Sequence, residues 1–314
     1  MITAKGLYKR YRKTVAVNQL SFDVRPGVVT GFLGPNGSGK STTMRLMLGL
    51  DHGEGETLFD GRTFGSIRRP MNDVGTLLEA KPFHPTRSAR NHLRMLASAN
   101  RIPDSRVDEV LEFVGLGDVK RKSPKSYSLG MAQRLGLAQA LLGDPRILLL
   151  DEPTNGLDPH GIHWMRDILK SLASEGRTIF VSSHLLSEMQ LMADELVVIG
   201  RGEMIFNGNV DQFVRDFTQA TVVVRGPQIG TLTAALESEG AEITKGDEGE
   251  LVVSGLEIDA VGHVAFAEGV ELHELSTRRA SLEEAFMSAT GASEQFVAQE
   301  IQTVVEQPGG AQHA

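Results

Sequence analysis

The sequence predicts an α/β fold with a parallel sheet covered by helices, followed by a smaller α+β domain. Two observations lead to this prediction. Apolar segments of strand length alternate with helical segments through most of the first 215 residues, which favours a parallel sheet between helices. After about residue 217 the composition changes and a shorter strand and helix pattern follows. A chain of 314 residues is long enough to bury a large core and to divide into two domains.

The N-terminal part begins with apolar and polar residues that alternate as in strands. The predicted strands of this part are residues 2–8, 15–24, 28–33, 147–151, 178–182 and 196–199. Asp60-Gly61 marks a turn close to a further hairpin. Between about residues 87 and 142 the apolar residues recur at helical spacing, and Pro103-Asp104-Ser105 is a helix start signal. This helical stretch interrupts the alternation, so we expect it to form a lobe of its own within a domain of residues 1–217.

The element order βαββαβ predicts a small ferredoxin-like domain over residues 218–290. Its predicted elements are a strand at 221–225, a helix containing Ile229, Leu232 and Leu236, strands at 241–245 and 250–254 joined by Gly246-Asp247-Glu248, a helix at 258–267 and a strand at 270–275. Residues 291–314 are mostly polar, and we expect them to form a flexible tail. A fold of this kind names no ligand.

Composition excludes several classes of protein. The formal net charge is −8 and the pI is about 5.6, which argues against nucleic-acid binding through a basic face. The chain has no cysteine, so disulfides and thiolate metal sites are excluded. The N-terminus lacks the apolar core of a signal peptide, and no apolar run has the length of a membrane span. We therefore expect a soluble intracellular protein that reaches a membrane only through a partner.

A glycine-rich turn lies between the predicted strand at 28–33 and a predicted helix that follows it. The residues of the turn are Gly34, Pro35, Asn36, Gly37, Ser38, Gly39, Lys40, Ser41 and Thr42. Such a turn directs backbone N–H groups and the positive end of the helix dipole at one point, which suits a phosphate. Lys40 can reach the outer phosphates of a nucleoside triphosphate, and the Ser41 hydroxyl can bind Mg²⁺. A chance glycine-rich turn is the alternative, and the flanking strand and helix disfavour it.

A buried strand at residues 147–151 ends in two acids, Asp151 and Glu152. We expect this strand to lie next to the phosphate-loop strand, because Asp151 would then reach the carboxyl edge of the sheet, where ligands bind. Asp151 can hold Mg²⁺ there, and Glu152 can take a proton from an attacking water. The alternative is a strand that ends in a solvated Asp-Glu-Pro turn.

Weaker signals come from single residues. His184 follows the strand at 178–182 and would face the same edge, although a lone histidine is more often a surface residue. Tyr11 could stack on an adenine, with Tyr8 as a competing candidate and a half-buried structural tyrosine as the alternative. Ser128 has the features of a helix N-cap, and Gly130 permits close backbone approach.

These motifs, in this order, resemble those of the ATP-binding cassette (ABC) ATPases over about the first 215 residues. Gly34–Thr42 is similar to the Walker A loop, 128–133 to the signature motif, 147–152 to Walker B, Asn155-Gly156-Leu157-Asp158 to the D-loop and His184 to the switch histidine. In that family two domains dimerise head to tail, and each ATP lies between one Walker A loop and the opposing signature helix. The resemblance therefore implies that Ser128, Gly130 and Asp158 belong to a nucleotide site shared between subunits. It also implies that Glu152 is the catalytic base, that His184 contacts the γ-phosphate, and that ATP and Mg²⁺ are the cofactors.

The chain departs from the family pattern in two places. The usual Leu-Ser-Gly-Gly-Gln is Tyr127-Ser128-Leu129-Gly130-Met131, so the first glycine and the glutamine are replaced. Glu79 stands where the family has a glutamine that binds the metal; a carboxylate keeps the acceptor oxygens and loses the amide donor.

The surroundings of Glu79, together with Tyr-Ser-Leu-Gly-Met, resemble the bacitracin- and lantibiotic-export ATPases. Residues 281–286 are similar to the accessory domain of drug-export ATPases. The resemblance implies a dimeric ATPase at the inner face of the cell membrane, which powers a separate permease. Residues 79–90 lie between the expected metal site and the helical lobe, so we expect this segment to contact the permease. The alternatives are a soluble cassette ATPase unconnected with transport and a regulatory module that binds ATP without turnover.

Overall fold

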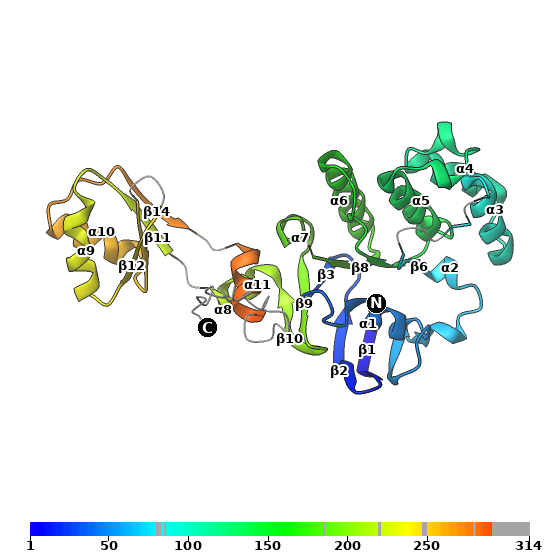
Figure 1. The fold of residues 1–314 in the computed structure, drawn as a ribbon, viewed down its shortest axis with the longest axis horizontal. Helices are drawn as coiled ribbons and strands as arrows, with labels where there is room; N and C mark the ends of the chain where they lie inside the picture. The colour runs from blue at the N-terminus through cyan, green and yellow to red at the C-terminus, as the bar shows by residue number, and fades with distance from the viewer. Residues whose placement is uncertain are drawn as a thin grey trace, which may run out of the picture.

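The molecule consists of an α/β cassette and a smaller domain that stands beside it (Figure 1). This computed structural model describes residues 1–79, 83–84, 86–184, 186–218, 221–246, 250–278 and 281–290. The predicted tail at 291–314 and the turn residues 247–249 lie outside these ranges. Within the described ranges, every helix is too short or too polar to cross a bilayer.

The first sheet of the cassette is antiparallel, with the strand order β2-β1-β4-β5. Its strands are β1 (Ile2–Tyr11), β2 (Thr14–Val24), β4 (Glu54–Phe59) and β5 (Arg62–Thr63). Alternate residues of β1 and β2 are buried and share a core with the second sheet. The rings of Phe22, Phe32 and Phe180 stack in that core, with centroids 5.0–6.0 Å apart. These rings join the two sheets and fix the first sheet beside the phosphate loop.

The second sheet has the strand order β10-β9-β3-β8-β7-β6 and is parallel apart from β10. Its strands are β3 (Val29–Leu33), β6 (Val74–Leu77), β7 (Ile147–Asp151), β8 (Thr178–Ser183), β9 (Glu195–Gly200) and β10 (Glu203–Asn209). The prediction that β7 lies next to β3 is wrong, because β8 pairs with both strands. β8 is buried along its whole length, which the central position explains. Asp151 pairs with Ser182 and therefore still reaches the carboxyl edge.

Helices cover the parallel sheet and form a lobe at one end of it (Figure 1). The helices of the cassette are α1 (Lys40–Met47), α2 (Pro70–Asp73), α3 (Ala89–Asn100), α4 (Asp104–Phe113), α5 (Leu129–Leu141), α6 (Pro159–Ser174), α7 (Leu186–Met192) and α8 (Val210–Phe217). Short 3-10 helices lie at Phe64–Ser66, Gly117–Val119 and Pro124–Ser126. The lobe contains α3, α4 and α5, in the stretch where the sequence has helical spacing.

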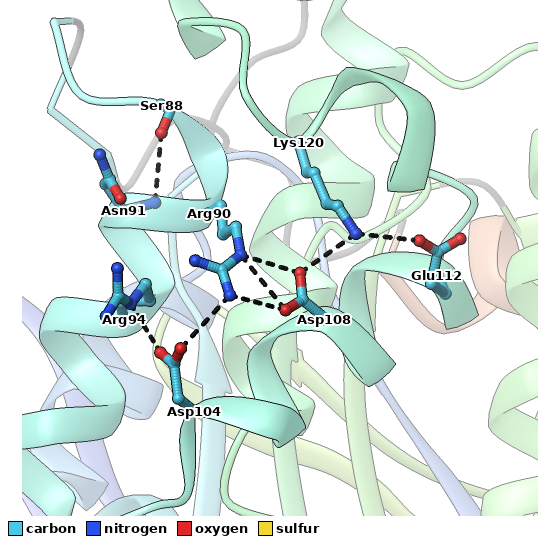
Figure 2. A network of polar contacts seen from close by, with 8 residues as sticks. All are labelled: Ser88, Arg90, Asn91, Arg94, Asp104, Asp108, Glu112 and Lys120. Atoms are coloured by element: carbon cyan, nitrogen blue, oxygen red, sulfur yellow. Dashed lines mark hydrogen bonds and ion pairs between the residues drawn. The ribbon is translucent and has the colours of Figure 1, made fainter.

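A charged network ties α3 to α4 within this lobe (Figure 2). The Arg90 guanidinium donates to both Asp108 oxygens, at 2.9 and 2.7 Å, and to Asp104 at 3.3 Å. Lys120 lies 3.1 Å from Asp108 on its other side and 3.2 Å from Glu112. The Arg90 hydrogen bonds hold the pKa of Asp108 well below its usual range. Arg90 ends the segment predicted to contact a permease, and its side chain is engaged within the lobe.

The smaller domain contains β11 (Thr221–Arg225), α9 (Ile229–Ser238), β12 (Glu242–Lys245), β13 (Leu251–Ser254), α10 (Ile258–Ala267) and β14 (Glu274–Arg278). Its sheet is antiparallel, with the strand order β12-β13-β11-β14. The predicted last strand at 270–275 is misplaced by several residues. The Val270 N–H donates to Ala265 O at 3.0 Å and Gly269 has φ +63°, so this segment ends α10 instead of starting a strand. The domain has its own apolar core.

The last described helix, α11 (Leu282–Thr290), returns to the cassette (Figure 1). Leu282 and Ala285 are fully buried in the core that also contains Phe213 of α8 and Met189 of α7. The Leu282 N–H donates to Gln190 Oε1 of α7 at 3.2 Å. The smaller domain is therefore inserted between two helices that both pack on the cassette, which differs from the predicted division at residues 218–290.

Candidate nucleotide site

The phosphate loop has a backbone that requires its glycines. Gly37 and Gly39 have φ of +80° and +107°, in the left-handed region that other residues rarely adopt. A Cβ on Gly39 would lie 2.3 Å from Ala16 O, and one on Gly34 would lie 2.6 Å from Ile199 O. The loop is thus held closely against β2 and β9 and leads directly into α1. The first N–H groups of α1 have no acceptor within the helix, as in any helix, and remain available for an anion.

Lys40 is the first residue of α1 and is 8 % exposed. Its Nζ donates to Gly34 O at 2.6 Å and to Pro35 O at 3.3 Å, so the ammonium lies inside the loop. Burial lowers the pKa of Lys40 from its ordinary value, whereas the negative charges of Glu152 and Asp151 act in the opposite direction. The carboxylates at the end of β7 therefore lie close enough to the loop lysine to stabilise its charge.

Asp151 is held by a residue of the neighbouring strand. The hydroxyl of Ser182, on β8, donates to Asp151 Oδ1. Ser182 is fully buried, and its register opposite Asp151 follows from the parallel pairing of β7 with β8. One oxygen of Asp151 is thus fixed in direction at the carboxyl edge.

Glu152 has an unusual backbone and is contacted on several sides. Its φ is +51°, which costs energy for a residue with a side chain. The Glu152 N–H donates to Ser182 Oγ at 3.0 Å, and its carbonyl accepts from the Asn155 N–H at 3.1 Å. Its carboxylate Oε2 lies 2.6 Å from His184 Nδ1. Since an ionised carboxylate can only accept, Nδ1 carries the hydrogen of this bond when Glu152 is charged. The predicted pair of Glu152 and His184 is therefore brought together.

The predicted metal ligands offer oxygen atoms, which Mg²⁺ prefers. Ser41 is exposed at the start of α1, next to Lys40, and Asp151 acts electrostatically on the same lysine. Glu79 is exposed just beyond the end of β6. The Arg45 guanidinium of α1 forms hydrogen bonds with Asp51 that raise its pKa, and the charge of Glu79 adds to this effect. These groups fit a divalent cation bound together with phosphates.

Tyr11 lies at the edge of the phosphate loop, and the residue is 47 % exposed. Its hydroxyl donates to Asp51 Oδ2 at 2.9 Å, and Lys9 Nζ lies 4.7 Å from the ring centroid. Burial and the bond to Asp51 raise the pKa of Tyr11, while a hydrogen bond with Thr42 of the loop lowers it. The competing Tyr8 is half-buried within β1, in register with Glu54 of β4.

Ser128, Gly130 and Asp158 lie at a different place in the same chain. Ser128 caps α5 by accepting from the Met131 N–H at 3.2 Å, and Asp158 caps α6 by accepting from the Gly161 N–H at 2.7 Å. All three line a cavity of about 500 Å³. Among the described residues that line this cavity, none belongs to the phosphate loop. Within one chain the structure does not bring them to the loop.

The departure at Leu129 has a structural counterpart in the turn before α6. Gly156 has φ +75°, and a Cβ there would lie 2.0 Å from Leu129 Cδ2. Leu129 therefore packs directly against the Gly156 backbone, although its side chain is still 41 % exposed. The leucine side chain at position 129 occupies the space that a side chain at position 156 would need, so glycine is required at position 156.

Two residues that hold Glu152 were missed as site residues in the sequence. Ser182 fixes both acids, and the buried Gln133 of α5 donates to the carbonyls of Glu152 and Asn155, at 3.4 and 3.2 Å. Two serines at the end of a strand whose centre is apolar were a visible signal for Ser182. Nothing in the sequence shows that Gln133 reaches the neighbouring strand end.

Comparisons with known proteins identify the family of this chain. Residues 17–155 match the ABC transporter family, and residues 220–283 match a family described as a domain of unknown function. The chain is 36 % identical over 302 residues to the uncharacterised ABC transporter ATP-binding protein YhcH of Bacillus subtilis, which covers 95 % of this chain and 98 % of that protein. It is 38 % identical over 212 residues to the lantibiotic transport ATP-binding protein SrtF of Streptococcus pyogenes, covering 67 % of this chain and 92 % of SrtF.

A solved structure, the ATP-binding subunit of an ABC transporter, superimposes with a TM-score of 0.63 at 25 % identity, over 69 % of this chain and 93 % of that one. The similarity to YhcH runs through almost the entire chain, including the smaller domain. The chain therefore belongs to the ATP-binding proteins of the ABC transporter family and is an ATPase of that family.

Proposed function

We propose that this chain is the cytoplasmic motor of an exporter: as a dimer bound to a separate membrane permease, it converts ATP hydrolysis into transport. The observation that carries the proposal is the convergence of Lys40, Asp151, Glu152 and His184 at one edge of the sheet. Hydrolysis of a phosphoanhydride depends mainly on positioning and on neutralising charge, and this edge offers both.

The phosphate loop binds the nucleotide phosphates. The N–H groups at the start of α1 supply hydrogen bonds, and the buried Lys40 supplies a positive charge. Because this ammonium is partly desolvated, its attraction to phosphate is stronger than in water. Tyr11 stacks on the adenine, and its position beside Thr42 supports this role.

Ser41 and Asp151 would hold Mg²⁺ together with the phosphates, and Glu79 would take the place of the usual glutamine. When bound, the ion supplies positive charge to the phosphate oxygens. Ser182 keeps Asp151 aimed at the carboxyl edge through the hydroxyl bond described above. Glu79 adds negative charge there, and the positive charge of Arg45 partly offsets it.

Glu152 is the general base and takes a proton from the attacking water. His184, bonded to the same carboxylate, orients it and contacts the γ-phosphate. The strained backbone of Glu152 supports this assignment, because left-handed residues that carry side chains are concentrated at functional sites.

A second ATPase subunit, either another copy of this chain or a relative, completes each site. Ser128 and Gly130 line an open cavity away from their own phosphate loop, so a second subunit is required to bring them to a γ-phosphate. The N-terminus of α5, capped by Ser128, then faces the partner's nucleotide. ATP thereby favours the closed dimer, and hydrolysis releases it. Asp158 belongs to the same interface.

The transported compound is a drug, a peptide antibiotic or a similar substrate. SrtF, which is named for lantibiotic transport, supports this choice. The permease contacts the segment at 79–90. Ala80, Lys81, Pro82 and Pro85 of this segment lie outside the described residues.

The smaller domain is a ferredoxin-like module of residues 221–278, and α11 belongs with residues 1–217. Its βαββαβ order and antiparallel strand order β12-β13-β11-β14 support this assignment.

The proposal is tested by phosphate release from the purified protein, alone and with its permease. Glu152→Gln is expected to bind ATP with unchanged affinity and to hydrolyse it about 100-fold more slowly or worse, because the base is lost. Size-exclusion chromatography should show that the variant remains dimeric with ATP. Glu237→Gln, an exposed change on α9, is the control. A hydrolysis rate of Glu152→Gln equal to that of the control would refute the role of Glu152.

A further inference from the structure

We propose that Gln133 is a positioning residue for ATP hydrolysis, which holds the backbone of Glu152 from the signature helix α5. The inference rests on the proposed role of Glu152 as the base. It assigns to Gln133 no contact with ATP or water; the residue acts only through Glu152 and the turn that follows it.

Gln133 makes two hydrogen bonds, and the NH₂ group of its side-chain amide is the donor in both. Gln133 Nε2 donates to Asn155 O at 3.2 Å and to Glu152 O at 3.4 Å. Both acceptors are main-chain carbonyls, which cannot donate, so the opposite orientation of the amide would place its oxygen against two other oxygens. The side chain is 2 % exposed. The chemistry of the acceptors thus fixes its orientation.

The location of these bonds suits a positioning role. Glu152 has a strained left-handed backbone, which persists only where the surroundings hold it. Ser182 holds its N–H, while Gln133 and the Asn155 N–H hold its carbonyl. Removing the Gln133 bonds lets the peptide turn, and the carboxylate moves with it. Displacements of about 1 Å at a reacting group can cost a factor of about 100 in rate.

Burying the amide of Gln133 costs folding free energy, and filling space in the core does not require an amide. Its Oε1 is buried and has no hydrogen-bond partner among the described residues. A buried amide oxygen without a partner destabilises the fold, by about 1–3 kcal/mol in typical proteins, unless a water binds it. An apolar side chain of similar size would avoid this cost. The two donated bonds are what such a replacement would lose.

The position also links two sites. Gln133 lies five residues after Ser128, which caps the same helix. A shift of α5 caused by a phosphate at Ser128 is therefore transmitted to the backbone of Glu152 in the same chain. In the proposed dimer these are the acids of the other nucleotide site.

The test compares Gln133→Leu with Gln139→Leu in the full-length chain. Gln139 lies on the same helix and bonds His92 Nε2 at 3.0 Å, away from the acids. Phosphate release, ATP binding by titration calorimetry and the melting temperature are measured for both. Gln133→Leu is expected to lower kcat at least about 10-fold while its Kd for ATP stays within about twofold of wild type. Gln139→Leu should keep the wild-type kcat.

A second arm separates positioning from a general loss of structure. In a Glu152→Gln background, adding Gln133→Leu should not lower the residual rate further, because both changes act through one group. An additional tenfold loss in that background would overturn the inference, as would a wild-type kcat for Gln133→Leu. A wild-type protein that releases no phosphate even with its permease would instead contradict the proposed function.

If Gln133→Leu does not fold, Gln133→Glu replaces it in both arms. Its carboxylate cannot donate when ionised, but a protonated carboxyl can. The kcat of this variant relative to wild type should therefore rise as the pH falls from about 8 to about 6, because burial raises the pKa of a carboxyl. A ratio that does not change with pH would overturn the inference.

Discussion

At the scale of single residues, the nucleotide site places a buried lysine close to two half-buried acids. Lys40 loses hydration inside the phosphate loop and regains stability from Asp151 and Glu152. Lys40 begins the helix that follows β3, whereas the two acids lie at the end of β7. Ser182 on β8, the strand between β3 and β7, donates to the Asp151 carboxylate and accepts from the Glu152 N–H. A nucleotide would add negative charge beside a lysine whose ammonium already lies inside the phosphate loop.

Lys40→Ala is therefore expected to weaken ATP binding itself. Charged hydrogen bonds contribute about 1.5–3 kcal/mol, so Kd should rise roughly 10- to 100-fold. Titration calorimetry with ATP measures it directly. Lys170→Ala, an exposed change on α6, is the control and should bind as wild type does. Equal affinity of the two variants would mean that Lys40 makes no net contribution to binding.

At the scale of helices and strands, local sequence signals predicted most elements correctly. They did not predict which elements lie side by side. The boundaries of β11 and α10, at Thr221–Arg225 and Ile258–Ala267, agree with those expected, and Ser128 caps α5 as expected. Capping and apolar periodicity depend on nearby residues, so they can be found in one sequence. The insertion of β8 between β3 and β7, and the reach of Gln133 to Glu152, depend on long-range packing that no local pattern encodes.

In the smaller domain, one buried acid offers a test by pH. Glu250 is 3 % exposed and accepts from Arg225 at 2.8 Å and Arg278 at 2.7 Å, which lowers its pKa. A depressed carboxyl pKa stabilises the fold above the unfolded value of about 4.3, and this stability is lost as the pH falls through the folded value.

Glu250→Gln is thus expected to lower the melting temperature by a few degrees at pH 7, because it leaves the two guanidinium groups without their shared carboxylate. The difference from wild type should shrink between pH 5 and pH 3. Calorimetry of the full-length chain measures it, with the exposed Glu242→Gln on β12 as control. A difference that stays constant over this range would contradict the ionic origin of the effect.

At the scale of the whole molecule, the smaller domain is fixed to the cassette at both ends. The sequence indicated where this domain begins, at the change of composition after residue 217. It did not indicate that α11 packs on the cassette instead of on the smaller domain. The apolar face of an amphipathic helix predicts that the helix packs on a core, but not which core. Leu282 and Ala285 are buried against α7 and α8, beside the segment that carries His184.

Leu282→Ala is expected to destabilise the cassette by about 2–5 kcal/mol, the usual cost of a core leucine. Urea denaturation followed at the cassette, through the fluorescence of the single tryptophan at Trp164, measures it. Met287→Ala on the same helix, 54 % exposed, should change stability by less than about 0.5 kcal/mol. If both variants unfold at the same urea concentration, α11 is not part of the cassette core.

The double attachment has a consequence for proteolysis. A protease that nicks only one of the two connections, after α8 or before α11, would not release the module, since the other connection still tethers it. Both connections must be cut to liberate the fragment. Conversely, a short artificial linker that bridges Phe217 to Ser281 would excise the module genetically and leave the motor with its last helix in place.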